Sequence, residues 1–303
     1  MHDVIIIGGG PAGLSAALIL ARCRRDIVLI DHAQGRNRFA REMHGYLSRD
    51  CVPPSEFLQH ARKDLARYDV CCIDDEAAHA RLTDDSTFLV RTQSGRELRS
   101  RKLLLATGVR DLLPQIEGFL DCYGKSAHHC PYCDGYEHRD QRIAAYGKGN
   151  NAIGIALALR TWSAHVTACL DGEAADTDHL DLARKNSIPI RPESVARLES
   201  RSGALQSVHF QSGPPLAADA LFFNTGQVQR SDLPRILGCH FDDNGGIKTS
   251  DRQCTSVPGL YLAGDADKEV QFVIVAAAQG ATAAVGINRE LQDEDRGTVT
   301  PKS

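Results

Sequence analysis

Two cysteines separated by two residues, Cys130 and Cys133, lie in the stretch HHCPYCDGYE at residues 128–137. Two histidines precede the pair, and Asp134 follows it directly. Such a cluster can supply ligands to a zinc ion, form a structural disulfide, or act as a pair of thiols that exchanges electrons with a substrate. The stretch by itself allows all three, so the choice depends on the rest of the chain.

Length, charge and composition exclude some classes of protein. The chain has 303 residues, 42% of them hydrophobic, and a formal net charge of -4. This length is sufficient for two domains with substantial cores. The slight negative charge provides no basic surface for nucleic acid or for an anionic membrane, so we expect neither as a partner.

An apolar run near the start, VIIIGGGPAGLSAALILA at residues 4–21, is about as long as a membrane-spanning helix. Three consecutive glycines and Pro11 interrupt it, and His2 and Asp3 ahead of it provide no basic region of a secretory signal. The run is more typical of a buried strand, a tight turn and a buried helix. We therefore expect a cytoplasmic protein with reduced cysteines.

The chain contains ten cysteines, and Cys130 and Cys133 alone combine a redox spacing with neighbouring turn residues and polar groups. For the other eight, the expectation in a chain of this kind is a reduced and mostly buried thiol. We interpret the adjacent Cys71 and Cys72 as residues of the core.

The N-terminal segment has the pattern of a dinucleotide-binding unit. DVIIIGGGPAG, LSAALILARCRRD and IVLID indicate a strand, a turn, a helix and a second strand. Gly8, Gly10 and Gly13 form G-x-G-x-x-G, and Asp31 ends the second strand. The glycines permit a tight turn, close approach of a pyrophosphate and close helix packing, while the acid can accept a ribose hydroxyl. The alternative is a glycine-rich turn in another α/β protein.

A second, weaker copy of this unit starts at Arg142. Gly147, Gly149 and Ala152 take the places of the three glycines, and Asp171 takes the place of the acid. The first strand of this copy is less apolar, and two asparagines lie where the turn would meet phosphates. An internal repeat of this kind indicates two nucleotide-type units in one chain.

The order of the motifs predicts how the two units are connected. KLLLATGVRDLLP and ALFFNTGQVQRSDLP each indicate a buried strand followed by a Thr-Gly turn, and GLYLAGDA places Asp265 after a last strand and before a helix at about 271–291. We predict an α/β fold with two Rossmann-like domains, each with three ββα layers. The outer domain would comprise 1–117 and 242–303, and the inserted domain 118–241.

With these motifs in place, the chain resembles the low-molecular-weight thioredoxin reductase family of class II pyridine nucleotide-disulfide oxidoreductases. The likeness covers nearly the whole chain, and C-x-x-C-D-G in the inserted domain is its most specific element. The resemblance implies that the outer domain binds FAD, that the inserted domain binds NADPH, and that the cysteine pair lies against the flavin. It also implies a homodimer.

The resemblance assigns roles to single residues. Gly8, Gly10, Gly13 and Asp31 would hold the adenosine and pyrophosphate of FAD, and Asp265 would bond the ribityl chain. The other expected flavin-site positions are Pro11, Ala12, Asn37, Thr107, Gly108, Gly264, Gln271 and Phe272.

Two departures from the family concern its cofactors. Where thioredoxin reductases carry His-Arg-Arg for the 2′-phosphate of NADPH, this chain has Leu170, Asp171 and Gly172. An aspartate repels a 2′-phosphate and suits a ribose hydroxyl, which disfavours NADPH and leaves NADH, or no nicotinamide nucleotide, as alternatives. Near the flavin, Gln271 and Phe272 replace the family's Arg-Gln.

Two stretches, HCPYCDGYE and RNRFAREMHGYLSRD, look more like one branch of the family. That branch contains the FAD-dependent dithiol oxidases that close disulfides in gliotoxin, holomycin and the depsipeptide prodrugs. Several of those enzymes pass electrons from the flavin to oxygen or another acceptor. They therefore do not require a nicotinamide donor.

The three interpretations of the cysteine pair can now be compared. A structural zinc site usually needs four ligands, whereas His128 and His129 would point to opposite faces of a strand and no second C-x-x-C exists. We therefore expect no metal. A static disulfide is disfavoured in the cytoplasm. A redox pair remains.

The family implies how the pair would work. Cys133 would face the flavin and Cys130 would exchange with the substrate sulfur. Asp134 and His129 are the candidate proton carriers, and the alternative for His129 is a histidine of the surface. Pro131 suits the first position of a helical turn, whose N–H groups would favour a thiolate.

Three functions are compatible with these residues and motifs. The first is oxidation of a small-molecule dithiol through Cys130, Cys133 and FAD, with oxygen or another acceptor. The second is a thioredoxin-disulfide reductase that takes electrons from NAD(P)H and passes them to a thioredoxin-like protein. The third is a flavin-loaded redox sensor with little turnover.

Overall fold

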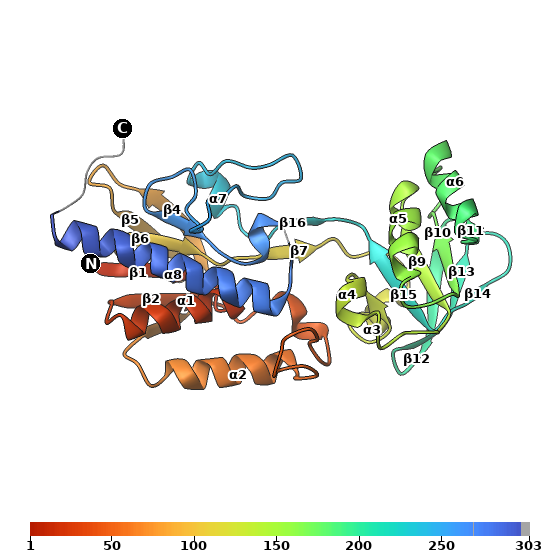
Figure 1. Ribbon diagram of the computed structural model, residues 1–303, viewed down its shortest axis with the longest axis horizontal. Helices are drawn as coiled ribbons and strands as arrows, with labels where there is room; N and C mark the ends of the chain where they lie inside the picture. The colour runs from red at the N-terminus through yellow and green to blue at the C-terminus, as the bar shows by residue number, and fades with distance from the viewer. Residues whose placement is uncertain (269, 298–303) are drawn as a thin grey trace. The chain divides into compact units, whose positions relative to one another are not determined.

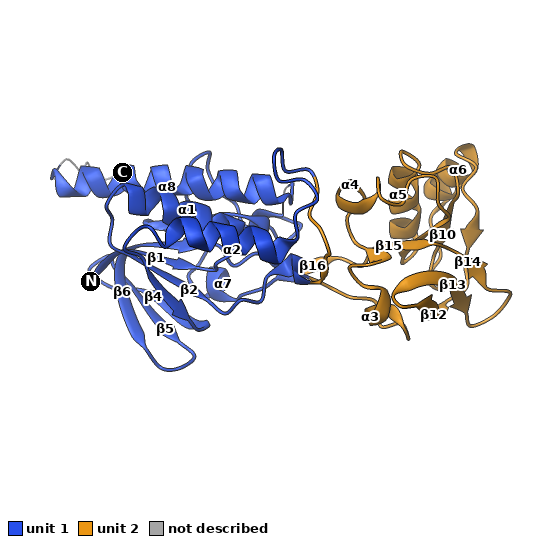
Figure 2. Cartoon of the chain, turned by 90° about the horizontal axis from the view of Figure 1, so that it is seen from below, with its two compact units in different colours: residues 1–38, 45–110, 228–303 blue, residues 39–44, 111–227 orange. Residues whose placement is uncertain are grey.

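The computed structural model describes residues 1–268 and 270–297. Contacts within the chain separate two compact units. Unit 1 comprises Met1–Arg38, Gly45–Arg110 and the chain from Val228, and unit 2 comprises Phe39–His44 and Asp111–Gln227 (Figure 2).

The helices and strands of the chain follow the α/β order (Figure 1). From the start to the first boundary they are β1 (His2–Ile7), α1 (Pro11–Arg22), β2 (Ile27–Asp31), a 3₁₀ turn (Arg36–Phe39), α2 (Pro54–Leu65), β3 (Cys71–Asp74), β4 (Ala77–Leu82), β5 (Phe88–Thr92), β6 (Glu97–Leu105) and β7 (Val109–Asp111). They continue as α3 (Phe119–Cys122), β8 (Ala127–His128), α4 (Pro131–Asp134), β9 (Ile143–Gly147), α5 (Asn150–Leu159), β10 (Val166–Cys169), α6 (Thr177–Lys185), β11 (Ile190–Arg191), β12 (Val195–Arg201), β13 (Ala204–Phe210), β14 (Leu216–Ala217), β15 (Ala220–Asn224) and β16 (Gln227–Gln229). The last elements are α7 (Leu233–Ile236), β17 (Leu260–Leu262), a 3₁₀ turn (Asp265–Asp267) and α8 (Val273–Asp295).

Unit 1 is built on one sheet with the strand order β3-β2-β1-β6-β5-β4, and β17 pairs with β6. The strands β3, β2, β1, β6 and β17 are parallel, whereas β4, β5 and β6 form an antiparallel meander. The nine-residue β6 belongs to both parts, because its first half pairs with β5 and its second half with β17. The meander can therefore fold over one face of the parallel strands.

Alternate residues of β1 enter two separate cores. Val4 and Ile6 pack with α1 and α8, whereas Ile5 and Ile7 pack with the side of the meander that carries Phe88. Figure 1 shows α1 and α8 together on their face of the sheet. Since side chains alternate along a strand, a fully apolar run is what a strand covered on both faces requires. The three layers are helices, parallel sheet and meander, which confirms the predicted ββα fold.

Unit 2 repeats this arrangement on a smaller scale. Its parallel sheet has the order β11-β10-β9-β15-β8, and β12, β13 and β14 form a separate antiparallel sheet. From β9, Ile143 and Ala145 face a core with α5, whereas Ala144 and Tyr146 face a core with β12 and β13. The internal repeat in the sequence is therefore a repeat of the fold.

Two features of unit 1 bear on the sequence interpretation. The helix expected at about 271–291 is α8, Val273–Asp295. The interpretation of Cys71 and Cys72 as core residues is wrong, because both side chains are exposed. They lie on β3, the strand at the edge of the sheet, where residue types alone do not reveal a missing neighbour.

The apolar run near the start is not a membrane span in this structure. It forms β1, the glycine turn and α1, which has 12 residues. Across the described residues, 1–268 and 270–297, no helix has the length and the apolar character needed to cross a membrane.

The contact between α1 and α8 gives a stability prediction. A Cβ at Gly280 would lie 2.0 Å from the carbonyl oxygen of Ala12, a backbone atom that cannot rotate away. We expect Gly280→Ala to lower the stability by about 1–3 kcal/mol, in spite of the higher helix propensity of alanine. Thermal unfolding followed by circular dichroism would show a lower Tm. The control is Gly154→Ala in α5, where no described atom outside the adjacent turns of the helix itself lies within 4 Å of the added Cβ. An unchanged Tm for Gly280→Ala would contradict the tight contact.

Candidate functional site

Cys130 and Cys133 form a disulfide in unit 2, with their Cα atoms 5.3 Å apart. Cys130 is the N-cap of the short helix α4, Pro131 is its first residue, and the backbone N–H of Cys133 donates to Cys130 Sγ at 3.2 Å. When such a disulfide opens, an N–H at this position stabilises negative charge on the Cys130 sulfur. The local sequence therefore folds as expected, with the turn residues holding both sulfurs together.

Aromatic side chains flank the disulfide within unit 2. Tyr132, between the two cysteines, is 74% exposed and packs edge-on against Trp162 with ring centroids 5.4 Å apart. A Cβ at Gly135 would lie 2.8 Å from the Trp162 ring, so glycine is needed for α4 to end against the indole. The disulfide thus borders a surface that can pack against an apolar substrate.

The acid of the cysteine motif is paired with a histidine. Asp134 Oδ1 lies 3.1 Å from Nδ1 of the buried His128. Burial raises the pKa of Asp134, but the His128 hydrogen bond and the charges of His128, His129 and His138 lower it, and the net pKa lies below its ordinary value. Asp134 is thus held as a carboxylate, which can accept a proton from a thiol.

The structure separates the two adjacent histidines, as expected for consecutive residues at a strand end. His128 contacts Asp134, whereas the His129 ring packs near Phe223 with ring centroids 6.2 Å apart. Sequence reasoning missed His128 as a partner of the acid. The one available signal was its place before the cysteine motif, which does not distinguish it from His129. Proton transfer by His129 stays a prediction.

The first glycine turn in unit 1 has room for a phosphate group. Gly8 has φ +109°, and a Cβ there would lie 2.2 Å from the Ala106 carbonyl oxygen. Gly10 instead has ordinary extended dihedrals, and among the described residues other than its two chain neighbours no atom lies within 4 Å of its Cβ position. Helix α1 begins at Pro11 without a side-chain cap in the described chain and with no acid in its first turn. Its N–H groups therefore favour an anion at this turn.

A buried polar atom lies beside this turn. Thr107 Oγ1 is buried and has no hydrogen-bond partner among the described residues. Because an unsatisfied buried hydroxyl is costly, its presence fits a group that binds there. The neighbouring Gly108 has φ +65° and accepts a hydrogen bond from the backbone of Arg230 at 3.1 Å.

Asp31 lies at the end of β2 as predicted and has a partner that the sequence did not indicate. Arg62 of α2 donates to Asp31 Oδ2 at 2.8 Å. A Cβ at Gly9 would lie 2.5 Å from the same carboxylate oxygen, so the second glycine of the GGG run leaves room for the acid. Arg62 therefore holds the Asp31 side chain in place next to the turn through a charge-assisted hydrogen bond.

The predicted flavin-site residues near the last helix form a second polar group in unit 1. Arg36 Nη1 donates to Asp265 Oδ2 at 2.8 Å and to Gln271 Oε1 at 2.7 Å, and Gln271 Nε2 donates to the Asp265 carbonyl at 3.3 Å. Asn37 lies in the 3₁₀ turn that carries Arg36, and Phe272 precedes α8. Arg36 was not identified from the sequence, because its partner lies 229 residues away.

Ala12 and Gly264 connect the two parts of this site. A Cβ at Gly264, which has φ +86°, would lie 3.1 Å from the Ala12 side chain. Gly264 N donates to Gln279 Oε1 at 2.7 Å, which ties the turn before Asp265 to α8. The open glycine turn, the unpartnered hydroxyl of Thr107 and this polar cluster together fit a dinucleotide with a flavin.

The second nucleotide-type unit differs in chemistry. Asp171 Oδ2 accepts from the Tyr146 hydroxyl at 2.6 Å, and its Oδ1 accepts from the backbone N–H of Val195 at 3.0 Å. Burial and the Asp171 carboxylate both raise the pKa of Tyr146, so this phenol stays a donor. Both oxygens of the acid that would receive a ribose are thus already bonded within unit 2.

The turn of this second unit is covered by its own chain. A Cβ at Gly149 would lie 2.7 Å from the carbonyl oxygen of Ala174. Asn150 Nδ2 donates to Asp176 Oδ2 at 2.6 Å, and the Asp176 N–H donates to Asn150 Oδ1 at 2.9 Å. The segment after Asp171 is therefore hydrogen-bonded to the first residue of α5, close to where a pyrophosphate would bind in a dinucleotide unit.

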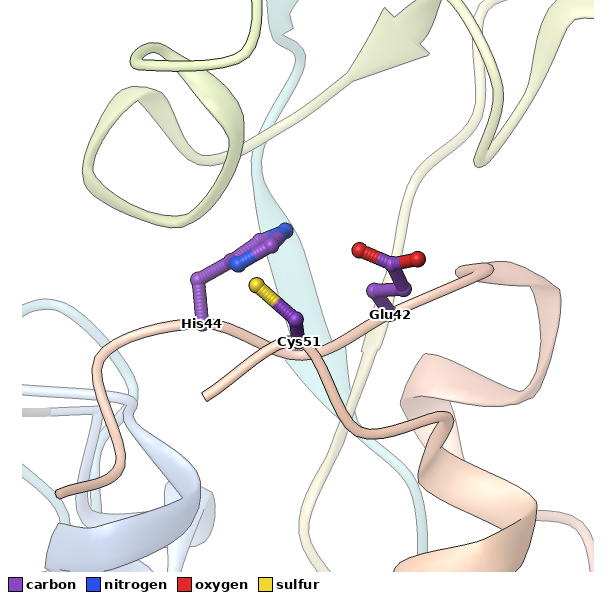
Figure 3. Close-up of side chains that lie close together, drawn as sticks. All are labelled: Glu42, His44 and Cys51. Carbon is purple, nitrogen blue, oxygen red and sulfur yellow. The ribbon is translucent and has the colours of Figure 1, made fainter. Parts of the chain in front are cut away.

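A further set of possible ligand atoms lies in the loop between the 3₁₀ turn at Arg36–Phe39 and α2. Figure 3 shows Glu42, His44 and Cys51, whose ligand atoms lie within 4.8 Å of one another. Glu42 and Cys51 are exposed and His44 is half-buried. Since Glu42 and His44 belong to unit 2 and Cys51 belongs to unit 1, we draw no metal site from them.

Comparison with known proteins supports the same assignment. The family model described as pyridine nucleotide-disulphide oxidoreductase matches residues 2–280. This chain belongs to the pyridine nucleotide-disulphide oxidoreductase family. Within that family it is a thioredoxin reductase-like, FAD-dependent disulfide oxidoreductase.

Individual relatives of this oxidoreductase span nearly its whole length. Thioredoxin reductase tcpT from Claviceps purpurea is 34% identical over 87% of this chain and 86% of that protein. The crystal structure of HlmI is 35% identical and covers 98% of this chain and 94% of its own, with a TM-score of 0.94. The oxidoreductase from Agrobacterium tumefaciens is 31% identical, covers 96% of this chain and 98% of its own, and has a TM-score of 0.88.

The glycine turn predicts how a single residue controls flavin binding by this oxidoreductase. We expect the purified protein to be yellow, with about one FAD per chain, and Gly10→Val to be colourless. Valine fits the backbone dihedrals of Gly10, and its Cβ would meet no described atom beyond the two chain neighbours, so its side chain would extend into the space that the pyrophosphate needs. Absorbance at the flavin maximum measures the content. Gly154→Val, at a similarly open position in unit 2, should keep its FAD. A yellow Gly10→Val protein would refute this site.

Proposed function

We propose that this oxidoreductase converts a small-molecule dithiol into a disulfide through Cys130, Cys133 and FAD, with oxygen or another acceptor as the oxidant. With oxygen, the dithiol loses two electrons and two protons, and oxygen becomes hydrogen peroxide. The electron pair passes from the substrate sulfurs to the Cys130–Cys133 disulfide and then to the flavin.

The observation that carries this proposal is the covered turn of the second nucleotide-type unit. The Ala174 carbonyl lies where a side chain at Gly149 would point, and Asp171 uses both of its oxygens within unit 2. These contacts oppose the binding of a nicotinamide nucleotide in its usual place. Electrons would then have to enter from a thiol substrate rather than from NAD(P)H.

The residues around the cysteine pair have separate roles in the proposed reaction. Asp134 accepts the proton of the attacking substrate thiol, and Cys130 forms the mixed disulfide. The N–H of Cys133 supports charge on Cys130 when it leaves in the second exchange. Tyr132 and Trp162 offer a surface for the apolar part of the substrate. FAD, when bound in unit 1, supplies the two-electron acceptor.

A second candidate function is thioredoxin-disulfide reduction with NAD(P)H, in which a thioredoxin-like protein is the partner. The name of the relative from Claviceps purpurea, a thioredoxin reductase, favours it. A flavin-loaded redox sensor with little turnover is the third. Hydrogen peroxide production with a dithiol separates the first function from the third. Anaerobic reduction of the flavin by nicotinamide nucleotides separates the first from the second.

The cysteine pair provides a direct test of the proposed chemistry. Cys130→Ser and Cys133→Ser should each reduce dithiol-dependent peroxide formation at least ~100-fold, because neither variant can form the internal disulfide, while FAD remains bound. Peroxide production in air with dithiothreitol measures this. Cys71→Ser is the control, because Cys71 is an exposed thiol of unit 1, and we expect it to turn over normally. Normal turnover by Cys133→Ser would exclude the pair as the redox centre.

An aspartate at position 171, with both carboxylate oxygens hydrogen-bonded within unit 2, predicts that the enzyme uses NADPH poorly. Losing two arginine contacts to the 2′-phosphate, at about 1.5–3 kcal/mol each, corresponds to a loss of about 10²- to 10⁴-fold in affinity. We expect NADPH to reduce the bound flavin very slowly, and no faster than NADH. Anaerobic stopped-flow bleaching of the flavin measures both rates, and a dithiol serves as the positive control. Fast bleaching at micromolar NADPH would favour the reductase function instead.

A further inference from the structure

Asp134 is the first member of a line of hydrogen-bonded side chains in unit 2. His128 Nδ1 faces Asp134 Oδ1 at 3.1 Å, and on its other side His128 Nε2 lies 3.0 Å from His138 Nε2. His138 Nδ1 in turn lies 2.9 Å from Gln141 Oε1. Asp134, His128 and His138 come from α4, β8 and the loop after α4, so the line depends on the fold and not on one local turn.

The two imidazoles are held in place by the core. Phe222 of β15 is fully buried, and its ring centroid lies 5.4 Å from that of His128 and 5.9 Å from that of His138. Strand pairing places Phe222 opposite His128. His128 is buried, whereas His138 is half-buried. The imidazole contact therefore starts beside the cysteine motif and ends near the surface of unit 2.

The contact between the two Nε2 atoms restricts where the protons are. A hydrogen bond between two imidazole nitrogens holds one proton, so one Nε2 donates and the other accepts. Because His128 Nδ1 faces a carboxylate, it carries a proton and donates. A neutral His128 ring with its proton on Nδ1 has no proton on Nε2. His138 Nε2 must therefore be the donor in the contact between the two rings. Gln141 completes the line, because its amide can present either a donor or an acceptor to His138 Nδ1.

We propose that His128 is a positioning residue for Asp134, holding it as a carboxylate beside Cys133, and that His138 fixes the tautomer in which His128 does so. This inference deepens the proposed function and rests on Asp134 as the base of the thiol exchange. It assigns the positioning of Asp134 to His128, which contacts the Asp134 carboxylate. It assigns an indirect role to His138, which contacts His128.

The reaction step that needs this arrangement is the first thiol exchange. The substrate thiol gives its proton to Asp134, and its sulfur forms a bond to Cys130 Sγ. The Cys130–Cys133 bond breaks, and its electron pair stays on Cys133 as a thiolate. His128 keeps donating to Asp134 Oδ1 throughout, so the proton is received on the other carboxylate oxygen.

Other titratable and charged groups lie near Asp134, His128 and His138, and they also affect the pH dependence of the exchange. His129 acts on Asp134, and Glu137 acts on His138. Asp219, before β15, is paired with Arg142, and His138 adds a small effect that lowers the pKa of Asp219. Burial lowers the pKa of His138 below its ordinary value, and the charge of His128 lowers it further. The hydrogen bond with Gln141 and the charges of Asp134 and Glu137 act in the opposite direction, but the net pKa of His138 is lowered, which favours its neutral ring.

The test compares two substitutions of one residue in the FAD-loaded enzyme. In His128→Asn the amide nitrogen takes the place of Nδ1 and still donates to Asp134. In His128→Gln the amide takes the place of Nε2, and the donor to Asp134 is lost. Loss of that donor removes an effect that lowers the pKa of Asp134, so this pKa rises.

The expected readout is the pH profile of the anaerobic reaction between the Cys130–Cys133 disulfide and dithiothreitol, quenched by alkylation and read by mass spectrometry. At low pH the rate declines as Asp134 becomes protonated, and we call this decline the acidic limb. In His128→Gln the acidic limb shifts to higher pH by about one unit. At a given pH on the limb the rate is then about tenfold lower than in the wild type, whereas the plateau rate is unchanged. His128→Asn keeps the wild-type limb. A limb unmoved in His128→Gln, or moved equally in both variants, would overturn the proposal.

The role of His138 has its own readout. In ¹⁵N NMR of the histidine side chains, His128 should carry its proton on Nδ1 in the wild type and in His138→Gln, whose amide still donates to His128 Nε2. In His138→Leu the Nε2–H or the doubly protonated form should appear. A wild-type His128 protonated on Nε2 would contradict the assignment.

A control separates this inference from general damage and from the proposed function. His209 of β13 lies 2.8 Å from Glu199, so His209→Leu removes a histidine–carboxylate pair elsewhere in unit 2. It should leave the pH profile unchanged. The exchange with dithiothreitol is measurable whether the enzyme acts as an oxidase or as a reductase. Absence of peroxide with dithiols would reject the oxidase function, whereas a normal profile in His128→Gln would reject the role of His128.

Discussion

Close contact between backbones at the first glycine turn is the constraint on which unit 1 depends. The Cβ position of Gly13 lies 1.8 Å from the carbonyl oxygen of Gly8, and that of Gly280 lies 2.0 Å from the carbonyl oxygen of Ala12. Strand β1, helix α1 and helix α8 can meet at one point because none of these contacts includes a side chain. Helix α1 also begins without a side-chain cap in the described chain, which is the arrangement that suits a pyrophosphate at its first N–H groups.

Unit 2 shows how the same βαβ arrangement can serve another purpose. Its parallel sheet and its covering helix resemble those of unit 1. Its acid, Asp171, accepts hydrogen bonds from Tyr146 and from the backbone of Val195, whereas Asp31 of unit 1 accepts from Arg62. The following segment bonds back to Asn150 at the start of α5. The acid of the second copy and the segment after it therefore make hydrogen bonds within unit 2, the unit that also carries the cysteine pair.

The polar groups near the cysteines are costly to bury and are stabilised by one another. Asp134 and His128 are buried or half-buried, and each has a partner at hydrogen-bond distance. Such a line is sensitive to the loss of any one member, because a buried donor or acceptor without a partner costs more than its bond contributes. This sensitivity makes the protonation state of Asp134 a property of the fold of unit 2 rather than of the cysteine motif alone.

Local sequence features determined the glycine turns, the repeat, the ββα fold and the cysteine spacing, because each depends on residues close together in the chain. The positions of the flavin-site residues could also be proposed from their motifs. Partners of the acids could not be, since Arg36 reaches Asp265 across 229 residues and Arg62 reaches Asp31 across 31. His128, and not His129, contacts Asp134 because of the direction in which the His128 side chain points from β8. Cys71 is exposed because β3 is an edge strand. Residue types specify which contacts are favourable, but only the tertiary structure decides which of them are within reach.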